Sequence, residues 1–136
     1  PEALKVAKRN AQLHGVKNIR FFEGDLLRPI YLRDLKVDLI LSNPPYITSD
    51  LLPHLPVSRF EPQIALDGGV DGLDYYRRLF EQVRDVGVPP IRMFLEVGSG
   101  QSQAVIDIAR QHVEIMLQEV IRDYAGHDRV VRLSVK

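Results

Sequence analysis

VDLILSNPPY, residues 37–46, decides how this chain is interpreted, because an apolar run passes directly into two consecutive prolines. The run 37–42 is apolar enough to predict a central strand covered on both faces. Pro44 and Pro45 donate no backbone hydrogen bond and hold φ near one value, and the residue before each proline is kept out of the helical region. We therefore expect a stiff turn at the end of a strand, the NPPY corner (residues 43–46), flanked by the carboxamide of Asn43 and the ring of Tyr46.

Such a corner has two interpretations. It can be an ordinary turn that ends a strand, or it can hold a planar amino group still while that group attacks an electrophile. A motif of four residues does not decide between them without its structural context.

Helices and strands alternate along the rest of the chain. Leu4, Ala7 and Ala11 recur at helical spacing and predict a first helix that ends at Gly15. Further helices are predicted over 73–86 and 103–111, and strands over 19–22, 91–97, 114–120 and 130–135. The last two strands are joined by a short turn, which implies an antiparallel hairpin. The alternation predicts an α/β sheet with helices on both faces, and the long loop (residues 47–70) is of the kind that is usually functional.

Composition limits the classes of function. The 136 residues suit one soluble domain, and the 18 basic and 18 acidic residues give no net charge to attract nucleic acid or a membrane. Cysteine is absent, which excludes disulfides and thiolate metal sites, and the scattered histidines suggest no metal site. No apolar run approaches membrane-spanning length and no signal segment opens the chain, so the cytoplasm is the default compartment.

The ends of two predicted strands place polar residues at one rim. Asp25 follows the strand 19–22 and Asn43 follows the strand 37–42, and ligands of such sheets bind outside the carboxyl ends of the strands. Asp25 could accept a hydrogen bond from the amino group of a nucleobase there, or it could simply cap a helix.

Residues along almost the whole chain carry a family resemblance. The matching positions are Ala3-Leu4, Ala7, Asn10-Ala11, Gly15, Asn18-Ile19, Gly24-Asp25, residues 38–47, Phe60-Glu61-Pro62, Ala65-Leu66, Asp71-Gly72-Leu73, Tyr76-Arg77, Leu95-Glu96-Val97-Gly98, Gln101 and residues 123–130. On these residues the chain resembles the HemK-type protein-(glutamine-N5) methyltransferases, which modify peptide chain release factors. That family belongs to the class I methyltransferases that use S-adenosyl-L-methionine.

The resemblance implies an acceptor site at the NPPY corner, with Asn43, Pro44 and Tyr46 catalytic and all four residues, Pro45 included, in contact with the substrate. If the side-chain oxygen of Asn43 and the carbonyl of Pro44 each accept one hydrogen of an amide –NH2, the nitrogen lone pair is turned out of conjugation. Tyr46 would then lie flat on the amide. Orientation and fixed dipoles would supply most of the acceleration, without a metal.

For the cofactor, the resemblance implies contacts from Asp25 and Leu26 to adenine and from Asn43 near the reacting methyl group. The implied fold is a Rossmann-like class I sheet truncated at its N-terminus and ending in an antiparallel hairpin, so that residues 1–136 form a partial catalytic domain. The glycine-rich cofactor loop and the acid that holds the ribose are expected upstream of Pro1. The first two strands and a helix of the expected sheet are also missing, and one of those strands should separate the strand 19–22 from the strand 37–42. The chain alone is expected to be inactive.

The implied reaction is methylation of the glutamine in the Gly-Gly-Gln loop of a release factor, without membrane or direct duplex DNA binding. Other acceptors stay open, because adenine and guanine amino groups are also flat. Residues 95–102 resemble a cofactor loop, with Glu119 as the ribose acid, and would make the chain a permuted enzyme for DNA adenine. Ser102 at the third glycine position and the neutral charge speak against that reading. The chain could also be a non-catalytic piece that needs a partner chain.

Overall fold

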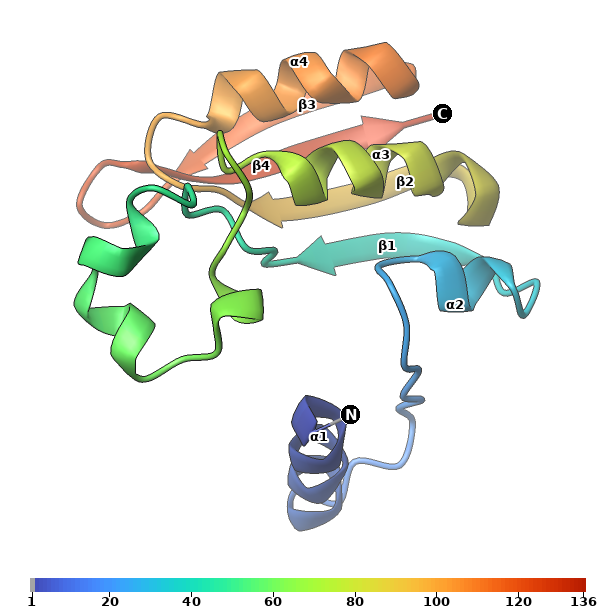
Figure 1. Cartoon of the computed structure of the whole chain (residues 1–136). Helices are drawn as coiled ribbons and strands as arrows, with labels where there is room; N and C mark the ends of the chain where they lie inside the picture. Colours follow the sequence, from blue (N-terminus) through green and yellow to red (C-terminus); the bar gives the residue numbers. More distant parts are fainter. Residues whose placement is uncertain (1) are drawn as a thin grey trace.

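A four-stranded mixed sheet organises the chain. The structure is a computed structural model that describes residues 2–136, those of 87–89 by their backbone alone. The strands are β1 (Val37–Ser42), β2 (Gly87–Glu96), β3 (Ile115–Arg122) and β4 (Asp128–Val135), in the spatial order β1-β2-β4-β3. β1 and β2 are parallel, whereas β4 runs antiparallel to both of its neighbours (Figure 1). The predicted α/β class, the strands over 37–42 and 91–97 and the terminal hairpin are thereby confirmed.

The hydrophobic core lies on one face of this sheet. Alternate residues of the central strands, such as Met93, Leu95 and Leu133, point to that face and are fully buried, as the two-residue period of a strand requires. The helices α3 (Asp74–Val86) and α4 (Ser102–His112) cover it, and Tyr76 and Phe80 of α3 belong to the same core cluster. The predicted helices over 73–86 and 103–111 are confirmed.

The opposite face of β1 is open, so the prediction of a strand covered on both faces is wrong. Leu39 is 44% exposed and Leu41 is 71% exposed. Within residues 2–136, β1 pairs only with β2, which leaves its second edge free. The predicted first helix forms as α1 (Glu2–Leu13), but it buries none of its residues and stands apart from the sheet (Figure 1). Helices therefore cover one face rather than two.

Residues 19–22 do not form a strand, and that prediction is also wrong. A strand needs a partner for its backbone groups, and no segment of residues 2–136 lies beside these residues to supply one. They run extended between α1 and the short helix α2 (Arg28–Tyr31), which the sequence did not predict (Figure 1). The ring of Phe22 is instead covered by the guanidinium groups of Arg20 and Arg33, whose central carbons lie 5.1 and 4.8 Å from the ring centre.

The long loop is ordered and returns to its starting point. It contains three 3-10 turns, η1 (Leu52–His54), η2 (Pro56–Arg59) and η3 (Gln63–Ala65). Its ends are tied together, because the Ile47 N–H donates to Leu66 O over 3.1 Å and the Gly68 N–H donates to Ile47 O over 2.8 Å. The loop therefore forms a closed excursion beside the NPPY corner. Among the helices of residues 2–136, none has the length and apolar character needed to cross a bilayer.

Candidate active site

The NPPY corner opens onto a cavity at the carboxyl end of β1. Pro44 is buried, whereas Asn43 next to it is exposed and makes no hydrogen bond through its side chain to any of residues 2–136. The cavity measures about 290 Å³, and the long loop forms its other wall. Its lining residues are Asn43, Pro44, Pro45, Tyr46, Ile47, Val57, Glu61, Ala65 and Leu66. All four residues of the predicted acceptor site thus share one cavity.

The ring of Tyr46 is fixed by the end of the neighbouring strand. Its hydroxyl donates to Glu96 Oε1 over 3.3 Å, and the hydroxyl of Tyr76 in α3 donates to the main-chain oxygen of Glu96 over 2.7 Å. Burial raises the pKa of Tyr46, and the negative charge of Glu96 raises it further, while the nearby guanidinium of Arg129 acts in the opposite sense. The phenol therefore keeps its proton at physiological pH and donates a hydrogen bond to Glu96.

Two glycines let the segment 67–73 approach the main chain of the corner closely. A Cβ on Gly68 would lie only 2.8 Å from Pro45 O and from Tyr46 Cα. Gly72 has φ +75°, and a Cβ there would overlap the carbonyl oxygen of Tyr46. Any larger residue at either position would push the corner away from the sheet.

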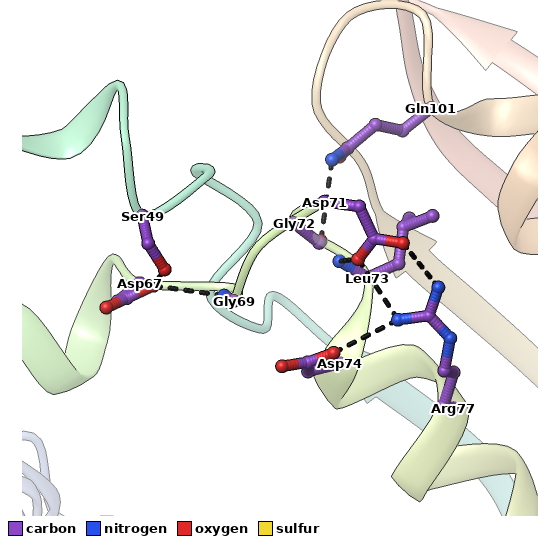
Figure 2. Close-up of polar contacts among 9 residues, drawn as sticks. All are labelled: Ser49, Asp67, Gly69, Asp71, Gly72, Leu73, Asp74, Arg77 and Gln101. Carbon is purple, nitrogen blue, oxygen red and sulfur yellow. Dashed lines mark hydrogen bonds and ion pairs between the residues drawn. The ribbon is translucent and has the colours of Figure 1, made fainter.

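The side chain of Gln101 connects three main-chain segments near the corner. Its Nε2 donates to Tyr46 O over 3.0 Å and to Gly72 O over 3.4 Å, and its Oε1 accepts the Gly98 N–H over 2.9 Å. Figure 2 shows the side chain reaching from the loop after β2 to the main chain at Gly72. One carboxamide therefore joins three segments, which are the NPPY corner after β1, the segment 67–73 before α3 and the loop after β2.

Two aspartates stiffen residues 67–73, which lead from the end of the long loop into α3. Asp67 accepts hydrogen bonds from Ser49 Oγ over 2.7 Å and from the Gly69 N–H over 3.0 Å, and these bonds lower its pKa (Figure 2). Asp71 accepts the Leu73 N–H over 3.1 Å and pairs with the guanidinium of Arg77, which lowers the pKa of Asp71. The segment 67–73 is thereby held in one conformation at the start of α3.

Asp25 and Leu26, the predicted cofactor residues, lie elsewhere. The carboxylate of Asp25 pairs with Arg78 and accepts a hydrogen bond from Gln82 Nε2 over 3.2 Å, both from α3. Leu26 packs partly against the core, with the unusual φ of +45°. Neither residue lines the cavity of Asn43. With the strand 19–22 unformed, the segment carrying Asp25 is attached to α3, and the roles of both residues stay predictions.

One cavity residue could not be found from the sequence. Val57 reaches the cavity only because the long loop folds back, and no short pattern in the sequence indicates that return. Glu61, which the resemblance includes, lines the cavity opposite the corner. Across residues 2–136 no group of three or more histidine, aspartate or glutamate side chains is arranged to hold a metal ion.

Comparison with known proteins finds relatives with one shared name. The release factor glutamine methyltransferase of Moorella thermoacetica is 46% identical over 131 residues, which are 95% of this chain and 46% of that protein. The protein of the same name from Dictyoglomus turgidum is 40% identical over 98% of this chain and 48% of its own length. No protein-family model matches.

The chain spans about half the length of the curated relatives that it matches. A solved protein-(glutamine-N5) methyltransferase from Alicyclobacillus acidocaldarius superimposes with a TM-score of 0.39 at 15% identity, covering 85% of this chain and 98% of that one, a likeness too low to establish anything by itself. The sequence relationship, which extends over nearly all of the chain at 40–46% identity, is sufficient, and the chain belongs, as a part-length sequence, to the family of release factor glutamine methyltransferases.

Proposed function

We propose that the protein containing this chain methylates the side-chain amide of a glutamine in a peptide chain release factor, within its Gly-Gly-Gln loop. The observation that carries the proposal is the exposed carboxamide of Asn43, which shares a cavity with Pro44 and Tyr46 at the end of a parallel strand. The names of the curated relatives support the same reaction and do not favour methylation of a nucleobase.

The acceptor half of the reaction follows from the chemistry of the corner. An amide –NH2 has two hydrogens, and Asn43 Oδ1 and Pro44 O are two acceptors on adjacent residues. When both are engaged, the nitrogen is held with a fixed orientation and its lone pair is freed for attack. Tyr46 supplies the flat wall against which the amide plane rests. The contribution of these residues is orientation and fixed dipoles, which need no general base before transfer.

The methyl donor proposed is S-adenosyl-L-methionine, which when bound supplies an electrophilic methyl group on a sulfonium. The described residues fit the donor only in part. In this proposal Asn43 lies near the reacting methyl group, but the carboxylate of Asp25 is engaged by Arg78 and Gln82. We therefore assign the acceptor side of the site to this chain. Residues 1–136 form, in this proposal, one part of a larger catalytic domain that acts in the cytoplasm.

The test uses the full-length gene product with S-adenosyl-L-methionine, a release factor and, in a parallel reaction, DNA. Mass spectrometry should find one methyl group on the glutamine of the Gly-Gly-Gln loop. Asn43→Ala should abolish turnover but leave the affinity for the methyl donor nearly unchanged, because orientation rather than binding is lost. Methyl groups on adenine with the glutamine untouched would refute the proposal.

A further inference from the structure

We propose that Gln101 is a positioning residue for this reaction, which holds the main chain of Tyr46 and thereby sets the orientation of the NPPY corner. The inference rests on the proposed function. Gln101 does not line the cavity of Asn43, so it does not touch the reacting group itself. It lines a second cavity of about 450 Å³, which shares Tyr46 and Ile47 with the first.

The contacts of Gln101 are directed at the main chain of the corner. The bond from its Nε2 to Tyr46 O, at 3.0 Å, is its shortest donation and joins residues 55 positions apart. The side chain is half-buried, and a half-buried hydrogen bond to a main-chain oxygen restrains that oxygen more than a solvent-exposed bond can. Tyr46 O belongs to the last residue of the corner, whereas Asn43 and Pro44 carry the two proposed acceptors. Pro44 and Pro45 lie between Asn43 and Tyr46, and they transmit any displacement of Tyr46 because their φ angles are fixed.

The site requires a glutamine rather than any polar residue of this length. The carboxamide must donate to two carbonyl oxygens, Tyr46 O and Gly72 O, and accept from the Gly98 N–H at the same time. Glutamate has the same shape but only acceptors, so it would face both carbonyls with a negative charge. Methionine has the same length and makes none of these bonds.

Glycines make the room that this side chain occupies. A Cβ on Gly72 would lie 2.5 Å from Gln101 Nε2, and a Cβ on Gly98 would lie 2.7 Å from Gln101 Oε1. Two separate loops therefore leave space on opposite sides of one carboxamide. This arrangement suits a residue that holds other segments in place.

The experiment compares Gln101→Met and Gln101→Glu with the matched variant Gln103→Met in the full-length protein. Gln103 lies two residues away on the surface of α4, where its side chain bonds, among residues 2–136, only to Asp107. Both substitutions of Gln101 should lower kcat for release factor methylation on the order of tenfold to a hundredfold, because the acceptor is misoriented. KM for the release factor should change by less than about twofold, since no substrate contact is removed. Gln103→Met should leave both constants unchanged.

Amide hydrogen exchange gives a second readout that does not depend on activity. In Gln101→Met the Gly98 amide should exchange faster, and so should the Gly68 amide, which donates to Ile47 O next to the corner. In Gln101→Glu the Gly98 amide keeps its acceptor and should stay protected, while the Gly68 amide should again exchange faster. This split separates a loss of the Tyr46 contact from a loss of the Gly98 contact.

Each outcome is informative. Loss of kcat in Gln101→Met with full activity in Gln101→Glu would assign the effect to the Gly98 loop and overturn the inference. Unchanged kcat in both variants, or an unchanged Gly68 amide, would overturn it as well. If the unsubstituted protein does not methylate the release factor, the proposed function fails, and the exchange of Gly68 still decides whether Gln101 holds the corner.

Discussion

Tyr46 and Glu96, fifty positions apart in the sequence, are joined by a hydrogen bond of 3.3 Å from the tyrosine hydroxyl to the carboxylate. Tyr46 follows the carboxyl end of β1, and Glu96 is the last residue of β2. The two strands are parallel neighbours with Ser42 opposite Leu95. The guanidinium of Arg129, from β4, adds its charge to the same pair. The aromatic wall of the candidate site is therefore set by three strands of the sheet and not by its own loop alone.

The first prediction concerns alkaline pH. Because the folded state raises the pKa of Tyr46 above its ordinary value of 10.0, the folded chain binds this proton more tightly than the unfolded chain does. The free energy of unfolding should consequently fall as pH rises above about 10. Tyr46→Phe should show a shallower fall, measured by urea unfolding at several pH values. Identical pH profiles for the two proteins would contradict the prediction.

The second prediction compares two glycines of similar φ. Gly72→Ala should lower the free energy of unfolding by about 2–4 kcal/mol, because a positive φ and an overlap with Tyr46 O are combined. Gly100 has φ +81° but nothing within 4 Å of a new Cβ. Gly100→Ala should therefore cost only about 1 kcal/mol, the penalty of the backbone conformation. Urea unfolding measures both, and equal losses would show that the close approach at Gly72 is unimportant.

The third prediction concerns acid pH and the segment 67–73 that leads into α3. The guanidinium of Arg77 holds the pKa of Asp71 below its ordinary value of 3.8, so the folded chain favours the carboxylate. This stabilisation is present above pH about 4 and is lost as pH falls through the lower, folded-state pKa. Asp71→Asn should lose stability at pH 7 and little at pH 2. Asp107→Asn, at an exposed pair within α4, is the control for a surface carboxylate.

The fourth prediction concerns the free edge of β1. An unpaired edge with Leu41 71% exposed is a template for pairing with another strand, so residues 1–136 alone should self-associate as their concentration rises. Leu41→Lys should shift the equilibrium toward the monomer, which analytical ultracentrifugation can follow. Leu117→Lys, at an exposed position on β3, tests whether any added charge has the same effect. A monomer at all concentrations would refute the prediction.

The local patterns predicted the elements that the chain can complete by itself. The strand 37–42, both helices of the covered face and the terminal hairpin depend on periodicity and on partners within residues 2–136, and they form. The strand 19–22 and the cover of the second face depend on partners that this sheet does not contain. Sequence periodicity indicates which side chains a segment can bury, but it does not indicate whether a neighbouring strand or a covering helix is present.

The candidate site divides in the same way. Residues 43–46 were predictable because a rigid corner after a strand is a local property, and the structure gathers them in one cavity. The opposite wall, from Val57 to Leu66, forms because the long loop closes through main-chain hydrogen bonds. Such bonds do not depend on side-chain identity, so the sequence does not reveal them. Asp25 was placed at the rim by an assumed strand, and without that strand Arg78 and Gln82 bind its carboxylate.

The two prolines of the corner also decide what it cannot accept. Pro44 and Pro45 have no N–H, so at these two positions of the cavity wall the main chain presents oxygens and no amide donor. A glutamine that has deamidated to glutamate would offer a carboxylate. Its oxygens would then face Asn43 Oδ1 and Pro44 O, which need hydrogens to accept. Repulsion between oxygens would then exclude the damaged side chain, and the corner would discriminate against it by electrostatics, although the two side chains have the same shape.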